Sequence, residues 1–208
     1  MTSTHSGIET LEDIRKIMER SSRFISLSGW SGIAAGLCAL IGAWLGYGAM
    51  GDYHSNANRE VAQCVECLRN NLVWIAAVVF AAAVFAAFIF TYIRSKRDGV
   101  AIWGNSARKL LWSTLVPMAV GGAFILRLIQ LEEYQLVASA SLIFYGLGLL
   151  NGSKYTLGEI RFLGYAQLLT GIISLWFTEY AIIFWAIGFG LLHIIYGIAM
   201  WWKYERNK

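Results

Sequence analysis

Long apolar blocks separated by short polar segments dominate the chain. Six blocks are mostly apolar, namely Phe24–Met50, Leu72–Ile93, Leu110–Gln130, Gln135–Asn151, Ile160–Thr178 and Tyr180–Trp202. A helix needs about 20 mostly apolar residues to cross the hydrocarbon core of a bilayer, so the pattern predicts six transmembrane helices, the fourth and fifth slightly short. Ten-residue alternating segments, which are typical of membrane β-barrels, are absent. The sequence therefore predicts an all-α, polytopic membrane helical bundle arranged as three hairpins.

The first 23 residues have a different pattern, because they are polar and highly charged. Ser6 and Glu9 fit a capping box, and a helix from about 8 to 21 would place Leu11, Ile14 and Met18 on one face. This predicts a cytoplasmic amphipathic helix, lying either on the membrane surface or against the bundle itself. The predicted organisation is an amphipathic segment (1–23), a transmembrane domain (24–202) and a short cytoplasmic tail (203–208).

Charge adds a direction to this picture. The chain carries 17 Lys and Arg residues and a formal net charge of +4. Most of these cations lie before the first block, after the second and fourth blocks, and in the tail, and these segments share one side of the predicted bundle. The positive-inside rule then places both termini in the cytoplasm, in a multi-pass protein of the cell inner membrane. Topology explains the basic composition without nucleic acid, so the expected partner is the lipid bilayer.

Small residues recur along the first block at steps of three and four. The stripe consists of Gly29, Gly32, Gly36, Ala39, Ala43 and Gly46. Such stripes let helix backbones approach closely in lipid. The stripe can face the chain's own helices or another copy, and the second case predicts a homo-oligomer.

Five polar residues near or within the last four blocks form a candidate binding site. They are Arg127, Gln167, Glu179, His193 and Tyr196. Polar groups inside a membrane are costly and usually face the bundle interior, so these side chains predict a polar cavity open to the outside that binds a small molecule. Two alternatives stay open: His193 is a neutral histidine bonded to Gln167 or a tyrosine, and Arg127 extends to the interface. No cofactor is predicted, because His5 and His54 lie outside the blocks and cannot pair with His193 around a haem.

The segment VAQCVECLRNN, residues 61–71, carries Cys64 and Cys67 in a C-x-x-C spacing, in a loop predicted to lie outside. In this motif and loop position the chain resembles the quinone-linked membrane thiol oxidases, and that resemblance implies redox exchange at Cys64 and Cys67. The family's second cysteine pair has no counterpart, since Cys38 is the only other cysteine. Glu66 disfavours a reactive thiolate. The alternatives are a structural pair or, with His54, a zinc site.

Motifs of soluble catalysis, such as a P-loop or a nucleophile elbow, are absent from the sequence. The stretch IRKIMERSSRFISLSG followed by a Gly/Ala-rich block resembles small polytopic bacterial inner-membrane proteins, a resemblance that implies no particular activity. The sequence favours a non-catalytic bundle that transports or binds a small molecule or supports a membrane complex. The alternatives are a quinone-linked thiol–disulfide oxidoreductase and a self-associating structural protein.

Overall fold

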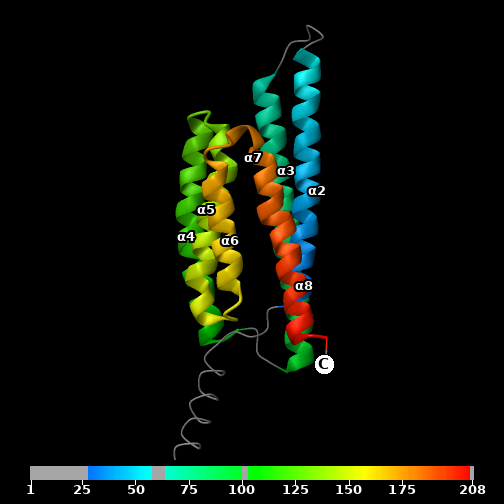
Figure 1. Cartoon of the computed structure of the whole chain (residues 1–208), viewed down its shortest axis with the longest axis vertical. Helices are drawn as coiled ribbons and strands as arrows, with labels where there is room; N and C mark the ends of the chain where they lie inside the picture. Colours follow the sequence, from blue (N-terminus) through cyan, green and yellow to red (C-terminus); the bar gives the residue numbers. More distant parts are fainter. Residues whose placement is uncertain (1–27, 58–63, 100–102, 207–208) are drawn as a thin grey trace, which may run out of the picture.

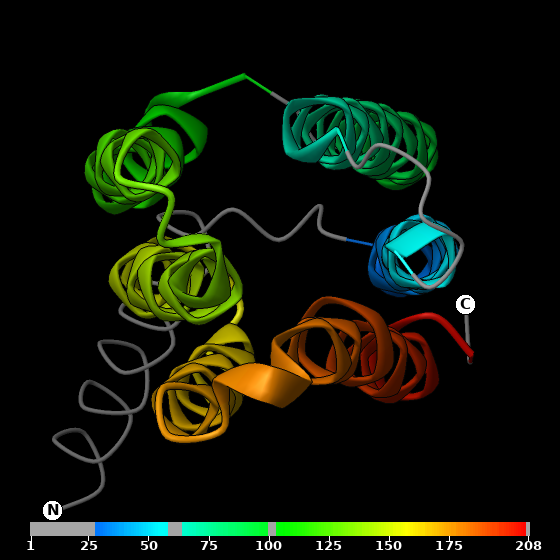
Figure 2. The same ribbon diagram turned by 90° about the horizontal axis from the view of Figure 1, so that it is seen from above.

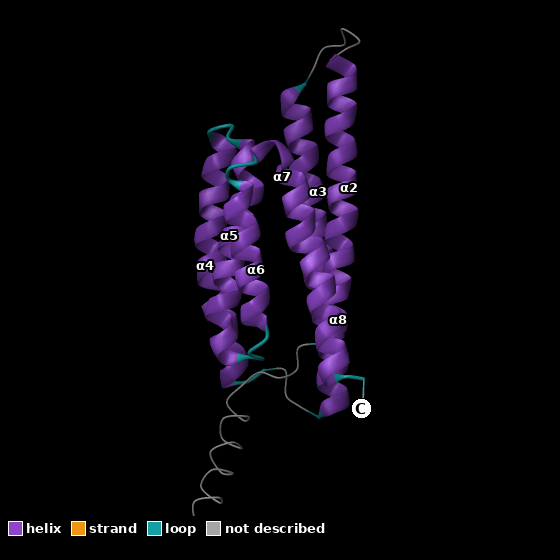
Figure 3. Cartoon of the chain, in the orientation of Figure 1, coloured by secondary structure: helices purple, strands orange, loops and turns teal. Residues whose placement is uncertain are grey.

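The computed structural model describes residues 28–57, 64–99 and 103–206. The predicted amphipathic helix over 1–23 lies outside the described residues. All regular structure in the described part is helical (Figure 3). The helices are α2 (Gly29–Ala57), α3 (Val65–Asp98), α4 (Asn105–Gln130), α5 (Val137–Gly152), α6 (Ile160–Ser174) and a last continuous segment made of α7 (Ala181–Trp185), the π-helix η4 (Ala186–Leu192) and α8 (His193–Tyr204). Three 3-10 turns join them: η1 (Tyr134–Leu136), η2 (Ser153–Tyr155) and η3 (Thr178–Tyr180).

Each of the six helical segments overlaps one of the six predicted apolar blocks, so the all-α prediction is confirmed for the described part. Five segments are long and apolar enough to cross a membrane. The exception is α6, whose 15 residues span only about 22 Å against a hydrocarbon core of about 30 Å. In contrast, α3 has 34 residues and a length of about 51 Å, so it is longer than such a core is thick.

The helices form a curved row in the order α4, α5, α6, the last segment, α2 and α3 (Figures 1 and 2). Extensive contacts join α4 to α5, α5 to α6, α6 to α7 and η4, α8 to α2, and α2 to α3. The two ends of the row, α3 and α4, make no comparable contact with each other. As a result, α4 is separated from η4 and α8 by α5 and α6.

Glycine lets the helices of this row approach closely. At the crossing of α2 and α8, a Cβ added to Gly29 would lie 2.5 Å from the carbonyl oxygen of Gly197. Further along α2, Gly32 and Gly36 face the backbone of α8 and η4 in the same way. The small-residue stripe of the first block therefore packs against the chain's own last segment. The alternative in which this stripe binds another copy loses its basis.

Polar side chains join α2, α3 and the residue after α8 where α8 ends. The Glu205 carboxylate follows α8 and accepts a 2.6 Å hydrogen bond from the Gly29 amide, at the start of α2. It also pairs with Arg94 of α3 at 2.7 Å. Both side chains are nearly inaccessible, at 6% and 7% exposed. A carboxylate at a helix N-terminus satisfies free amides and complements the helix dipole, so Glu205 closes the start of α2.

A second polar contact joins the start of α6 to the end of α8. Glu159 accepts hydrogen bonds from Lys203 and from the Tyr204 hydroxyl, the latter at 2.7 Å. Partial burial raises the pKa of Glu159, but these two hydrogen bonds outweigh it and hold the pKa below its ordinary value. The carboxylate is thus charged at neutral pH and holds α6 beside α8.

Candidate functional site

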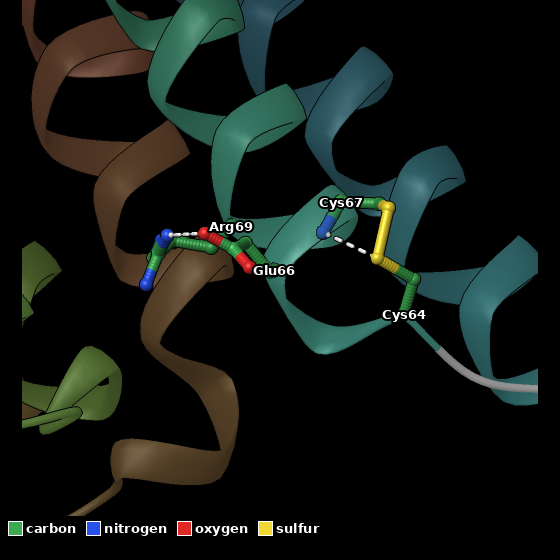
Figure 4. The surroundings of a disulfide bond; sticks show 4 residues. All are labelled: Cys64, Glu66, Cys67 and Arg69. Carbon is green, nitrogen blue, oxygen red and sulfur yellow. Dashed lines mark hydrogen bonds and ion pairs between the residues drawn. A yellow bond between two sulfur atoms is a disulfide. The ribbon is translucent and has the colours of Figure 1, made fainter.

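The C-x-x-C pair lies at the N-terminus of the longest helix. Cys64 and Cys67 form a disulfide, and both residues are exposed. Cys64 is the N-cap of α3, and the backbone N–H of Cys67 donates a hydrogen bond to its sulfur at 3.1 Å (Figure 4). N-terminal helix amides and the positive end of the helix dipole stabilise negative charge. Once the disulfide is reduced, this position lowers the cost of forming the Cys64 thiolate.

The charge of Glu66 is compensated locally. Its carboxylate pairs with the Arg69 guanidinium at 2.9 Å, one turn along the helix. Figure 4 shows this ion pair on one side of the first turn of α3 and the disulfide on the other. In the sequence, Glu66 argues against a reactive thiolate. The ion pair weakens that objection, because the Glu66 carboxylate has its own cation and points away from the sulfurs.

A groove begins one turn below the disulfide. Asn71 and Ile75 lie four and eight residues after Cys67, so the three side chains share one face of α3. Together with Trp44 and Tyr47 of α2, Asn71 and Ile75 line an open groove of about 500 Å³. The groove therefore lies between α2 and α3, near the end of α3 that carries the disulfide.

The other roles considered for the cysteines have less support. A zinc site needs thiolate ligands, whereas both sulfurs are joined in the disulfide. The side chain of His54, the third ligand in that alternative, lies outside the described part of the chain. Cys38 is a free thiol in the interior of α2. It is 26 residues away from Cys64 in the sequence and is not paired with either cysteine.

A buried polar network lies where the last helical segment widens into η4. Gln167 of α6 is fully buried, and its side-chain amide donates a 2.8 Å hydrogen bond to the carbonyl oxygen of Gly188. His193 is 6% exposed and contacts the same carbonyl through Nδ1 at 3.0 Å. On its other side, Nε2 lies 2.9 Å from the hydroxyl of Tyr145 in α5. The network thus links α5, α6 and η4.

The contact with Gly188 favours one tautomer of His193. A carbonyl oxygen can only accept, so it favours a proton on Nδ1, whereas the Gln167 side-chain nitrogen, which lies 3.3 Å from Nδ1, is itself a donor. In a neutral ring Nε2 is then an acceptor, and the Tyr145 hydroxyl donates to it. This is the arrangement considered in the sequence analysis, a neutral histidine bonded to a tyrosine, with Gln167 sharing the same carbonyl.

Two atoms of the candidate binding site are buried without a hydrogen-bond partner in the part of the chain that the structure describes. They are the side-chain oxygen of Gln167 and the hydroxyl of Tyr196, three residues after His193 on α8. Buried polar atoms are nearly always paired, so each such exception calls for an explanation. An unseen water or a small polar ligand would satisfy either atom.

The remaining two residues of the candidate binding site do not join this network. Arg127 is exposed on α4 and donates to Gln130 at 3.2 Å, and Glu179 is exposed in η3. No ion pair connects Arg127 to Glu179 in the part of the chain that the structure describes. The polar cavity requires the third, fifth and sixth helical segments to be neighbours, but α5 and α6 separate α4 from the last segment.

Sequence reasoning missed two members of the network, Tyr145 and Gly188. The sequence did offer a signal for Tyr145, because it is a residue with a polar hydroxyl in the middle of a mostly apolar block. The role of Gly188 had no signal, since it depends on which backbone carbonyl the widened turn presents to α6.

In comparisons with known proteins, the chain matches no family model, no curated protein and no solved structure.

Proposed function

We propose that the chain is an integral membrane protein that performs thiol–disulfide exchange at Cys64 and Cys67. The observation that carries this proposal is the position of Cys64: it is exposed, caps the N-terminus of α3 and accepts a hydrogen bond from the Cys67 amide. A purely structural C-x-x-C has no need of an exposed sulfur at a helix N-terminus. This geometry favours the enzymatic alternative over the non-catalytic bundle.

The exchange proceeds through a mixed disulfide at Cys64. A substrate thiolate attacks the Cys64 sulfur, the bond between the two cysteines breaks, and Cys67 leaves as a thiolate and takes up a proton. A second substrate thiolate then attacks the first substrate sulfur of the mixed disulfide and expels Cys64, whose thiolate is stabilised by the helix N-terminus. In the balance, two substrate thiols become one disulfide, and Cys64 and Cys67 become two thiols.

Turnover needs an electron acceptor, and we assign this role to a membrane quinone. The quinone takes two electrons and two protons and becomes a quinol while the disulfide re-forms. No second cysteine pair exists in the sequence to relay electrons, so the acceptor must reach the Cys64–Cys67 pair itself. The groove lined by Trp44, Tyr47, Asn71 and Ile75 supports this route, because it opens one turn below Cys67 and runs along apolar helices.

The test is quinone reduction by the full chain in mild detergent, with dithiothreitol as the dithiol and a short-chain ubiquinone as the acceptor. We expect the wild type to catalyse the reaction, and Cys64→Ser and Cys67→Ser each to lower the rate by about 100-fold or more, since loss of a covalent nucleophile is rarely compensated. Cys38→Ser is the matched control and should keep full activity.

Trapping separates the two cysteines. Cys67→Ser should accumulate a mixed disulfide when its Cys64 thiolate attacks a probe disulfide and releases the probe thiol, and Cys64→Ser should not, because the helix N-terminus activates Cys64. A pair that stays oxidised in excess dithiothreitol, or quinone reduction that persists in both variants, would contradict the proposal and leave the disulfide as a structural link.

A second candidate function is the binding of a small polar molecule at the buried network. It is favoured by two buried atoms that have no hydrogen-bond partner among the described residues, Gln167 Oε1 on α6 and the Tyr196 hydroxyl on α8. Native mass spectrometry of the full chain should then show a non-covalent adduct that is lost in Gln167→Leu. The matched control is Gln130→Leu, which removes an exposed amide. An adduct that survives Gln167→Leu, or a wild type without any adduct, would rule this function out.

A further inference from the structure

A small pocket lies on the predicted cytoplasmic side of the bundle, whereas the disulfide lies on the predicted outer side. It encloses about 270 Å³ between the first two turns of α4 and the η2 turn. Its lining includes Arg108, Lys109 and Trp112 of α4 and Tyr155 of η2. Two cations and two interfacial aromatic residues thus surround one cavity that neither the thiol chemistry nor the buried network uses.

The pocket exists because α4 and α5 pack closely at this end. Gly152 ends α5 against Thr114 and leaves no room for a side chain there. The side chain of the preceding residue, Asn151, donates a 2.8 Å hydrogen bond to the carbonyl oxygen of Ser113. These contacts hold the turn that follows α5 beside the start of α4, which brings Tyr155 opposite Arg108.

Among the described residues, the two cations of the pocket have no acidic partner. In residues 28–57, 64–99 and 103–206, neither Arg108 nor Lys109 forms an ion pair. The first turn of α4 contains no acidic residue, and its N-cap, Gly104, offers no side-chain oxygen. The acid that follows η2, Glu159, is engaged by Lys203 and Tyr204. Within the described residues, the pocket therefore presents positive charge without an acidic partner, augmented by the positive end of the α4 dipole.

We propose that this pocket binds the phosphate of an anionic phospholipid headgroup. The volume suits a headgroup rather than a whole lipid, and the acyl chains have a surface to follow. Beyond the pocket, α4 continues as an apolar span on which Leu111, Trp112 and Leu115 are 46%, 63% and 44% exposed. A free phosphate would use the cations but not this apolar surface. Basic pockets beside membrane helices on the cytoplasmic side commonly hold anionic headgroups.

This inference depends on the membrane location in the proposed function but not on the disulfide. The test reconstitutes the full chain in nanodiscs of phosphatidylcholine with a minority of phosphatidylglycerol, and native mass spectrometry then measures the lipid retained. We expect the wild type to retain phosphatidylglycerol preferentially. In Arg108→Gln/Lys109→Gln the preference should fall roughly five-fold for each cation removed.

The matched control removes two other exposed cations from the same predicted face, Lys96→Gln/Arg161→Gln, and should keep the preference. The charge-preserving variant Arg108→Lys/Lys109→Arg should retain most of the preference. That result would show that the Gln variant loses the preference through its missing charges and not through misfolding. An equal loss in the control would overturn the proposal, because diffuse surface charge would explain the binding. Displacement of the lipid by millimolar inorganic phosphate would overturn it as well, and would assign the pocket to a soluble phosphate. Quinone reduction by the double variant distinguishes this outcome from a failure of the thiol chemistry.

Discussion

Replacing Glu205 by alanine is expected to destabilise the protein by about 3–5 kcal/mol, the range found when one partner of a buried ion pair is removed. The Glu205 carboxylate is 6% exposed and joins three elements: it pairs with Arg94 of α3 and accepts from the backbone amide of Gly29 at the start of α2, while following α8 in the chain. Its loss removes a 2.7 Å partner from the buried Arg94, which also pairs with Asp98 at 3.4 Å, and takes away the acceptor of the Gly29 amide.

The reciprocal change, Arg94→Ala, should cost less than Glu205→Ala. The Glu205 carboxylate would then keep its hydrogen bonds from Gly29 and Ser28 and its place at the α2 N-terminus. Unfolding in mixed micelles by titration with a denaturing detergent measures both free energies. Glu66→Ala is the control, because it breaks an exposed pair with Arg69 and should leave the unfolding curve almost unchanged. Equal, small effects of Glu205→Ala and Glu66→Ala would show that the buried pair does not hold the helix ends.

Gly197→Ala is expected to destabilise the protein by about 1–3 kcal/mol, toward the upper part of the range for overpacking. The new Cβ would lie 2.6 Å from the carbonyl oxygen of Gly29 and 2.7 Å from the amide nitrogen of Ile33. Both are backbone atoms of α2, so no side-chain rotation relieves the clash. The helices α2 and α8 must move apart.

Gly122→Ala provides the opposite expectation. Gly122 is also helical, but nothing lies within 4 Å of its would-be Cβ. Alanine there should be neutral or stabilising by up to about 1 kcal/mol, since glycine loses more conformational freedom in a helix. The same detergent titration compares the two variants. If both changes had the same sign and size, helix propensity and not the α2–α8 crossing would govern stability at Gly197.

The six helical segments follow directly from the sequence, because the length of an apolar block is a local property of the chain. The ends of the helices were harder to predict from the sequence. The apolar block Leu72–Ile93 predicts a span, but α3 extends from Val65 to Asp98, since polar residues continue a helix once it has formed. The fifth block shows the opposite deviation: α6 ends at Ser174 and the chain turns before Thr178.

The candidate binding site shows why side-chain partners were harder to predict. The sequence placed His193 and Gln167 in the interior, and they do share the Gly188 carbonyl. It also grouped them with Arg127 and Glu179, because all four are polar residues within or at the ends of the blocks. That grouping needed the order of helices around the bundle, and sequence spacing does not encode which helices become neighbours.

The sequence by itself determined the helical architecture, the grouping of cations in particular segments and the presence of a C-x-x-C near the start of an apolar block, because each depends only on residues close together in the chain. The tertiary structure decided what these residues meet. It placed Cys64 as the cap of α3, packed the Gly29 stripe on α8, joined Arg94 to Glu205 across 111 positions and opened the basic pocket beside Tyr155. The physical reason is that burial, pairing and charge compensation arise between helices distant in sequence, and only their packing brings those groups within contact distance.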